Sequence, residues 1–238
     1  MKICMDHGMS KSRDEKSILH DRGSVRWGMV VDLRKCVGCA TCRDICARLH
    51  ENLWAYSWRR VICVNNGCTE SNSGKERTYL TMSCMQCGNP LCLEACPTGA
   101  TYARSDGIID IRKDLCIGCG ACIVACPYRA RWICTEDEVS DNETFGKSKE
   151  AESRQDYIGV CTKCNFCIDL IEEGKTKGLK PGIDPEATPL CVRFCIAEAL
   201  YFGDLSDQES TVSQLIRDNK TTRLLEEMDT DPKIYYIL

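Results

Sequence analysis

Cysteine is the residue type with the most obvious chemistry in this sequence of 238 residues, which contains 21 cysteines. Sixteen of them fall in four sets with short, repeated spacings. The sets are CVGCATCRDIC from Cys36, CMQCGNPLCLEACP from Cys84, CIGCGACIVACP from Cys116, and a split set made of KCNFC at 163–167 and LCVRFC at 190–195. The repetition indicates four copies of one kind of site, each built from sulfur.

The spacing C-x2-C-x2-C suits a [4Fe-4S] cluster. Such a cluster needs four thiolates, and a tight loop with this spacing can wrap three corners of the cube. Gly38, Gly118 and Gly120 would let the backbone approach the inorganic sulfides and point N–H groups at them. In ferredoxins the fourth cysteine of such a run binds the other cluster of a pair.

The residue after the fourth cysteine fits this interpretation. Pro97 and Pro127 occupy that place in the second and third sets, where a fixed φ and a missing N–H turn the chain away. Ala47 and Ile196 stand there in the first and last sets. We therefore expect a looser turn at those two positions.

Zinc and disulfides are the competing uses of these cysteines. Structural zinc usually takes two C-x2-C pairs separated by a longer loop, whereas three of the sets carry four thiols within 11 to 13 residues. The split set, with C-x2-C and C-x3-C, is zinc-like by itself, but beside the other three sets a cluster is favoured. Disulfides between cysteines at this spacing would be strained, and 21 is an odd number.

Five cysteines lie outside the sixteen, and we expect most of them to be unpaired, which fits a reducing setting. They are Cys4, Cys63, Cys68, Cys134 and Cys161. Cys161 is an alternative ligand, because CTKCNFC could supply Cys161 and Cys164 in place of Cys164 and Cys167.

The segments after the cysteines predict the elements that position them. Three sets are followed, four and six residues after the last cysteine, by an alanine and an aromatic residue, and this alternation predicts short strands. We expect these strands to pair with GIIDI at 107–111 and GMVVDL at 28–33 in small antiparallel sheets. The pairs are Ala100 and Tyr102, Ala130 and Trp132, and Ala199 and Tyr201.

These patterns predict an α+β fold of tandem ferredoxin-like (4Fe-4S dicluster) modules, with small antiparallel sheets, loops that wrap the clusters, and a C-terminal helix and tail. A capping box at Ser206 and Glu209 predicts the helix over 210–219, and after Pro232 the segment 233–238 predicts a terminal strand. The expected segments are an N-terminal extension (1–26), the first set with its connection (27–83), a dicluster ferredoxin module (84–134), a hydrophilic insertion (135–160), the fourth set pairing with the first (161–203) and a docking tail (204–238).

Composition and motifs exclude several classes of function. A formal charge of −4 argues against a nucleic-acid partner, and no apolar run approaches the roughly 20 residues of a membrane span. The first residues lack the apolar core of a signal peptide, so we expect export, if any, to depend on a partner. No Ser-His-Asp set, P-loop or G-x-G-x-x-G motif is present to predict catalysis by the chain itself.

The four sets, in this order, resemble those of the iron–sulfur subunits of molybdopterin oxidoreductases such as polysulfide, thiosulfate and dimethyl sulfoxide reductases. The resemblance covers roughly residues 27–238. It is carried by NLWAYSWRRV, CPTGATYARSDGIIDI, CIGCGACIVACPYRAR, KCNFC and ALYFGDL. KGLKPGIDPEATPLC and the ending KIYYIL are similar to the thiosulfate reductase and phenylacetyl-CoA:acceptor oxidoreductase branch.

The resemblance implies which cysteines share a cluster, in four groups that we call sites 1 to 4. They are site 1 (Cys36, Cys39, Cys42 and Cys195), site 2 (Cys46, Cys164, Cys167 and Cys191), site 3 (Cys84, Cys87, Cys92 and Cys126) and site 4 (Cys96, Cys116, Cys119 and Cys122). The family's Lys-Cys pair matches Lys163 and Cys164, which favours Cys167 over Cys161. Every ligand position is cysteine here, so four [4Fe-4S] clusters are expected.

Each oxidised cluster with four thiolates carries a charge of about −2. We expect four arginines to offset part of this charge, the alternative being that they are solvated surface residues. They are Arg59, Arg60, Arg129 and Arg131.

The expected function is that of a non-catalytic electron-transfer subunit. It would relay electrons between a large molybdopterin catalytic subunit and a membrane-anchor, quinone-reactive subunit, and would be peripheral to the membrane, with the cytoplasmic side favoured. The alternatives are a freestanding polyferredoxin, an electron-transfer subunit of a hydrogenase or formate dehydrogenase complex, and a radical or hydrogenase-type iron–sulfur enzyme in its own right.

Overall fold

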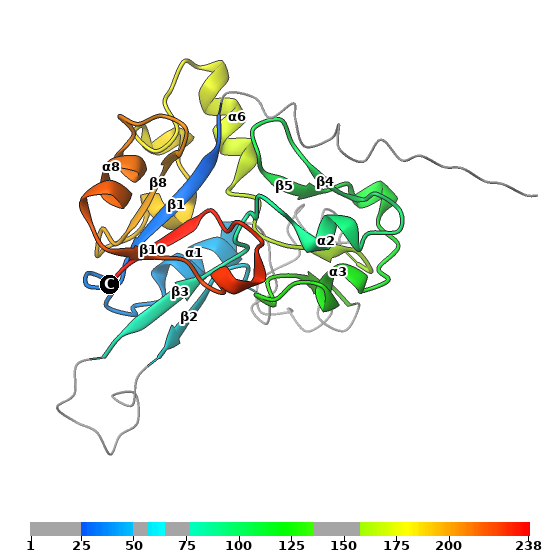
Figure 1. Cartoon of the computed structure of the whole chain (residues 1–238). Helices are drawn as coiled ribbons and strands as arrows, with labels where there is room; N and C mark the ends of the chain where they lie inside the picture. Colours follow the sequence, from blue (N-terminus) through cyan, green and yellow to red (C-terminus); the bar gives the residue numbers. More distant parts are fainter. Residues whose placement is uncertain (1–24, 50–56, 65–76, 136–157) are drawn as a thin grey trace, which may run out of the picture.

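The computed structural model describes residues 25–49, 57–64, 77–135 and 158–238. The expected N-terminal extension and hydrophilic insertion therefore lie mostly outside the described residues. Four groups of strands and several short helices make up the described parts (Figure 1). In chain order the elements are β1 (Trp27–Asp32), α1 (Thr41–Leu49), β2 (Arg60–Cys63), β3 (Tyr79–Met82), α2 (Leu91–Glu94), β4 (Thr101–Ala103), β5 (Ile109–Ile111), η4 (Lys113–Leu115), α3 (Ala121–Val124), β6 (Trp132–Ile133), β7 (Cys161–Thr162), α6 (Ile168–Thr176), η6 (Pro185–Ala187), α7 (Leu190–Arg193), β8 (Leu200–Asp204), α8 (Thr211–Asp218), β9 (Thr221–Thr222), η7 (Glu226–Met228) and β10 (Ile234–Ile237).

The largest sheet has four strands in the order β8-β1-β10-β9. β1 pairs antiparallel with β8, with Val30 opposite Tyr201, as the alternating pattern predicts. β1 also pairs in parallel with β10, with Met29 opposite Ile234. The sheet is therefore mixed, whereas only antiparallel sheets were expected, because a sequence pattern gives no information on which distant strand becomes the second neighbour.

β1 is buried on both faces, which explains its continuous apolar run. Met29 and Val31 point into the main core, together with Phe202 of β8. Val30 points to the opposite face, where it packs against Val212 of α8. Figure 1 shows α8 on the outer side of β8 and β1. The large sheet thus separates the main core from a smaller core under α8.

The remaining sheets are two-stranded; one of them pairs as predicted, and a second contains a predicted strand with a different partner. β4 pairs antiparallel with β5, with Tyr102 opposite Asp110, as expected. β6, which contains Trp132, pairs antiparallel with β7. The third sheet, β2 with β3, was not predicted from the sequence. In Figure 1, β4, β5, α2 and α3 gather on the side of the molecule away from the large sheet.

The C-terminal segment contains the predicted helix and strand, with one correction. The cap of α8 is Ser210, whose hydroxyl accepts a hydrogen bond from the backbone N–H of Ser213, so the capping box expected at Ser206 is wrong. β10 buries Ile234, Tyr236 and Ile237 completely inside the chain. These three side chains are unavailable to a partner, although a docking role for the rest of 204–238 stays a prediction.

Within the described ranges, no helix has both the length and the apolar character needed to cross a membrane.

Candidate functional site

Each cysteine set forms the same turn at its C-x2-C pair. The residue directly before the second cysteine has a positive φ in all four sets. These residues are Gly38 (φ 70°), Gln86 (φ 49°), Gly118 (φ 64°) and Phe166 (φ 60°). Glycine adopts this conformation at little cost, whereas Gln86 and Phe166 hold it against a steric penalty of the order of 1–2 kcal/mol. The surrounding structure therefore imposes this turn even where the sequence lacks glycine.

The last two cysteines of each set lie in or just after a helix, and in the split set that helix is α7, which is separated from the turn by α6. The paired cysteines are four residues apart: Cys42 and Cys46 in α1, Cys92 and Cys96 at α2, Cys122 and Cys126 at α3, and Cys191 and Cys195 at α7. α2 and α3 stop after four residues, before Pro97 and Pro127, whereas α1 continues through Ala47 to Leu49. The looser turn expected at Ala47 is thus a continuing helix.

The four cysteines of site 1 line one pocket of about 340 Å³. Cys36, Cys39 and Cys42 come from the loop after β1 and from α1, and Cys195 comes from the end of α7. Cys39 is exposed and Cys42 is buried. Residues about 150 positions apart in the sequence therefore meet at a single hollow with one open side.

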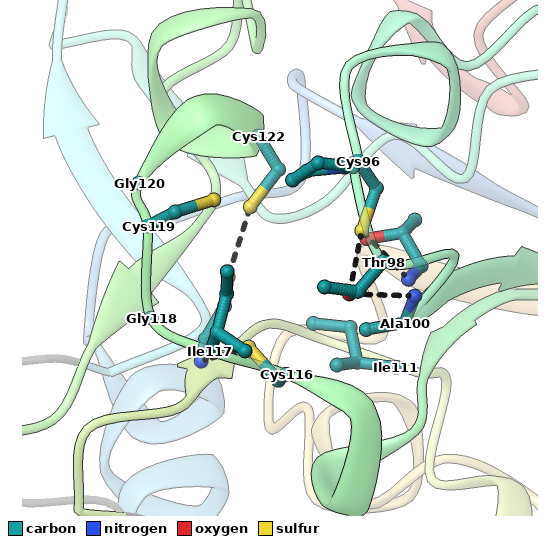
Figure 2. A pocket seen from close by; sticks show the side chains of 13 residues that line it. Cys96, Thr98, Ala100, Ile111, Cys116, Ile117, Gly118, Cys119, Gly120 and Cys122 are labelled. Carbon is teal, nitrogen blue, oxygen red and sulfur yellow. Dashed lines mark hydrogen bonds between the residues drawn. The ribbon is translucent and has the colours of Figure 1, made fainter.

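The four cysteines of site 4 line a second pocket, of about 330 Å³. Figure 2 shows Cys119 and Cys122 on one side of the hollow, Cys96 on the other and Cys116 at its edge. Cys119 is exposed. Two different sets of four cysteines thus each line a separate pocket.

Cys161 lies at site 4, not among the cysteines of site 2. Its side chain lines the site 4 pocket, with its sulfur 3.5 Å from the sulfur of Cys122, and its backbone N–H donates to the sulfur of Cys116 at 3.3 Å. The Cys161 thiol lowers the pKa of Cys122 to about 6. The structure therefore separates Cys161 from its sequence neighbours Cys164 and Cys167.

The four cysteines of site 2 are all buried. Burial raises the pKa of Cys46, and the neighbouring thiols of Cys164, Cys191 and Cys167 raise it further. Burial likewise raises the pKa of Cys191 to about 11, although the guanidinium of Arg59 opposes the effect. The thiols of this site are so close together that deprotonating one of them makes deprotonating the others less favourable.

The cysteines of site 3 also influence one another. Burial raises the pKa of Cys87 to about 12, and the thiols of Cys84, Cys92 and Cys126 contribute. Four thiols gathered in a largely dry environment suit a cationic metal group, because binding it replaces the protons and removes the repulsion.

The donor sets fit iron–sulfur clusters. None of the sixteen predicted ligands is disulfide-bonded. Among the residues that the structure describes, no group of three His, Cys, Asp or Glu side chains is arranged to hold a single metal ion. At sites 1 and 4 the four thiols line a hollow, which matches a cluster whose irons each take one thiolate.

The structure divides the four predicted charge-offsetting arginines into two kinds. Arg59 and Arg131 are buried, with exposed fractions of 1% and 3%. Arg60 is half-buried and Arg129 is exposed. The buried Lys163 was not predicted as a charge-offsetting residue, and its place directly before a ligand cysteine was the only sequence signal for it.

Cys63 is an exception to the expectation that most of the five other cysteines are unpaired. It is disulfide-bonded, whereas Cys134 and Cys161 take no part in a disulfide. Cys4 and Cys68 lie outside the described residues. The sulfurs of all four sites thus stay available for metal, since none of them takes part in the disulfide.

Comparison with known proteins agrees with the sulfur chemistry of the site. The family model of the 4Fe-4S dicluster domain matches residues 75–145. This range contains the complete second and third cysteine sets.

Several relatives match across most of the chain. A Halobacterium salinarum protein, named as a candidate iron-sulfur subunit of dimethyl sulfoxide reductase, is 37% identical over 89% of this chain and 78% of its own length. A selenate reductase subunit of Mesobacillus selenatarsenatis is 38% identical over 90% of this chain and 72% of its own length. One of the polysulfide reductase chains of Wolinella succinogenes is 31% identical over 89% of this chain and 94% of its own length.

Proposed function

Because this chain belongs to the family of iron–sulfur subunits of molybdopterin oxidoreductases, we propose that it holds four [4Fe-4S] clusters and relays electrons between two partner subunits. Sites 1 to 4 supply four thiols each, and when bound, each cluster would supply a one-electron redox centre. The chain's own residues hold the clusters, keep water from them and set their charge environment. We assign no substrate chemistry to the chain itself.

One observation carries this proposal: neighbouring sites share helices and charges in the order 1, 2, 3, 4. α1 carries Cys42 of site 1 and Cys46 of site 2. The thiol of Cys84 in site 3 raises the pKa of Cys164 in site 2, after the larger effect of burial. A continuous series of sites is what a relay needs.

The two ends of this series reach the surface, whereas no ligand cysteine of sites 2 and 3 is exposed. Cys39 of site 1 and Cys119 of site 4 are the exposed ligand cysteines. Exposed apolar side chains lie beside them in the sequence, with Val37 at 60% and Ile117 at 67% exposed. We propose that these two ends face the partners, one of them a large molybdopterin subunit and the other a membrane-anchored, quinone-reactive subunit.

The arrangement supports two ferredoxin-like modules. The second and third sets would form one module with sites 3 and 4, and the first and fourth sets would form the other with sites 1 and 2. In each module two short helices supply the exchanged cysteines, α2 with α3 and α1 with α7.

The names of the relatives place them in reductase complexes, so we propose that this chain is a peripheral subunit of a membrane-associated complex. The Cys63 disulfide favours an oxidising compartment over the cytoplasmic side that the expected unpaired thiols favoured. Labelling of intact cells with a membrane-impermeant lysine reagent tests the side, since only a chain outside the cytoplasmic membrane would be modified.

The proposal is tested by analysis of the complex purified without oxygen. We expect about sixteen irons and as many acid-labile sulfides per chain, and co-elution with a large molybdenum-containing protein. Half of that iron, or zinc in its place, would contradict four clusters.

Elution alone, near the 26.7 kDa of the chain, would instead favour a freestanding electron carrier.

A further inference from the structure

Three buried cations occupy the junctions between the four sites, and none of them has a carboxylate partner within the described parts of the chain. Arg59, Lys163 and Arg131 are exposed by only 1%, 3% and 3%. The ion pairs of the described residues do not include them. An unpaired buried charge is costly, so an anion must compensate each of these cations.

Arg59 lies between sites 1 and 2. Its guanidinium donates to the hydroxyl of Thr81 at 3.2 Å, and that hydroxyl lies 3.8 Å from the sulfur of Cys42 in site 1. The same guanidinium opposes the effect of burial on the pKa of Cys191 and Cys164 in site 2. One charge therefore reaches ligands of both sites.

Lys163 lies between sites 2 and 3. Its ammonium donates to the carbonyl of Cys164 in site 2 at 3.0 Å and to the carbonyl of Ile109. Gln86, which directly precedes Cys87 of site 3, donates to the same Cys164 carbonyl at 2.6 Å and accepts from the Ile109 N–H at 2.8 Å. The ammonium is thus held where the loops of the two sites meet.

Arg131 lies between sites 3 and 4. One nitrogen of its guanidinium donates to the sulfur of Cys92 in site 3 at 3.0 Å. Another donates to the hydroxyl of Thr101 at 3.0 Å and lies 3.9 Å from the sulfur of Cys161, which contacts Cys122 of site 4. The Arg131 guanidinium therefore contacts site 3 directly and reaches site 4 through the thiol of Cys161.

Resting on the proposed function, we propose that Arg59, Lys163 and Arg131 are positioning residues of the relay, each raising the reduction potential of the two clusters on either side of it. Reduction adds a negative charge to a cluster, and a cation held in a dry environment stabilises the reduced form more than the oxidised form. A cation shared by two sites also weakens the repulsion between neighbouring reduced clusters. Along the relay, each pair of neighbouring sites therefore has one buried cation between its two members.

The test is a potentiometric titration of the purified complex, followed by electron paramagnetic resonance, with Arg59→Gln, Lys163→Gln and Arg131→Gln. We expect each variant to make two of the four reduction steps about tenfold less favourable, which is about 59 mV per electron. Lys163→Gln should share one shifted step with Arg59→Gln and another with Arg131→Gln. Arg59→Gln and Arg131→Gln should share none.

The matched controls remove the same charge at the surface. Arg217 on α8 and Lys177 after α6 have side chains that are both 58% exposed, and Arg217→Gln and Lys177→Gln should leave all four steps unchanged. Arg59→Lys and Arg131→Lys keep the charge and should shift the steps by less than half as much as the glutamine variants.

The pattern of outcomes separates this inference from the proposed function. Fewer than sixteen irons in the unaltered chain overturns the relay itself. If the glutamine variants keep all their iron but their reduction steps are unshifted, only the role of the cations is overturned. The same holds if all four reduction steps shift equally. If Arg59→Gln or Arg131→Gln loses iron while the lysine variant at the same position keeps its iron and its reduction potentials, the positive charge is needed. Equal loss of iron in the glutamine and lysine variants overturns the role of the charge.

Discussion

In the proposed assignment, the second and third cysteine sets and the first and fourth sets would build similar pairs of sites from very different stretches of chain. Sites 3 and 4 use cysteines from a continuous stretch of about 40 residues, 84–126. Sites 1 and 2 combine 36–46 with 164–195 and are closed by the large sheet, to which β1, β8 and β10 contribute. The ligands of the first pair are thus close together in the sequence, whereas those of the second pair are brought together only by the tertiary fold.

Loop closure gives this difference a magnitude. Joining Cys36 to Cys195 closes a loop of about 160 residues, whereas joining Cys84 to Cys126 closes one of about 40. The entropic cost of closure grows with the logarithm of length, so the longer loop costs ~1 kcal/mol more. The clusters and the sheet of the split region must offset this extra cost.

The largest expected effect comes from removing one ligand in each region. Cys195→Ala and Cys126→Ala occupy equivalent places and should each lose about a quarter of the iron, one cluster in four. The melting temperature should fall further for Cys195→Ala, because its cluster closes the longer loop. Iron analysis and calorimetry measure both effects, and an equal fall in melting temperature would contradict the comparison.

The next effect tests whether the sheet holds the split region. Ile234→Ala removes a fully buried side chain of β10 and should lower the free energy of unfolding by about 2–5 kcal/mol. Hydrogen exchange should show lost protection in β1 and β8, with β4 and β5 little changed. As a control, Ile183 is 71% exposed, and its replacement by alanine should cost no more than ~0.5 kcal/mol.

A smaller effect probes the tight turn inside the continuous region. Gly118→Ala places a Cβ at φ 64°, where it would overlap the carbonyl oxygen of Gly159. Gly99→Ala has a similar φ of 69° but open space around the added atom. We expect Gly99→Ala to cost about 1–2 kcal/mol of unfolding free energy from the backbone alone. Gly118→Ala should lower the unfolding free energy by more than Gly99→Ala does, and it should slow the assembly of the cluster at site 4. If denaturant titrations gave equal costs for the two variants, the backbone at Gly159 would be able to move away from the added Cβ.

The smallest effect is a pH dependence at the end of β1. Arg34 donates to both carboxylate oxygens of the buried Asp32, at 2.9 and 2.8 Å, and holds the pKa of Asp32 below its usual value. A lowered pKa in the folded state gives stability that is present above the unfolded pKa, near 3.9, and is lost as the pH falls through the folded value. Arg34→Gln should therefore lose stability near neutral pH and show a weaker dependence on pH below about 4.

Melting temperatures between pH 2 and 7 measure this dependence. Arg43→Gln is the control, since Arg43 and Asp44 are both largely exposed and their ion pair contributes little. The same acid profile in Arg34→Gln as in the unaltered chain would contradict the role of this pair.

The sequence by itself determined the sulfur chemistry and the local structure around it. The spacing of the cysteines, Pro97 and Pro127, and the alternation at Tyr102 and Tyr201 identify turns, helix ends and strands, because these depend on neighbours a few residues away. The capping box at Ser206 failed since Ser210 competes for the same role only four residues later.

The tertiary structure decided which distant segments meet. The parallel pairing of β10 with β1, the position of Cys161 at site 4 and the burial of Arg59, Lys163 and Arg131 all depend on contacts between residues far apart in the chain. A charged residue at the surface and one between two clusters look alike in a sequence. Only the packed chain shows which charges are removed from water, and burial is what gives those charges their effect on the sites.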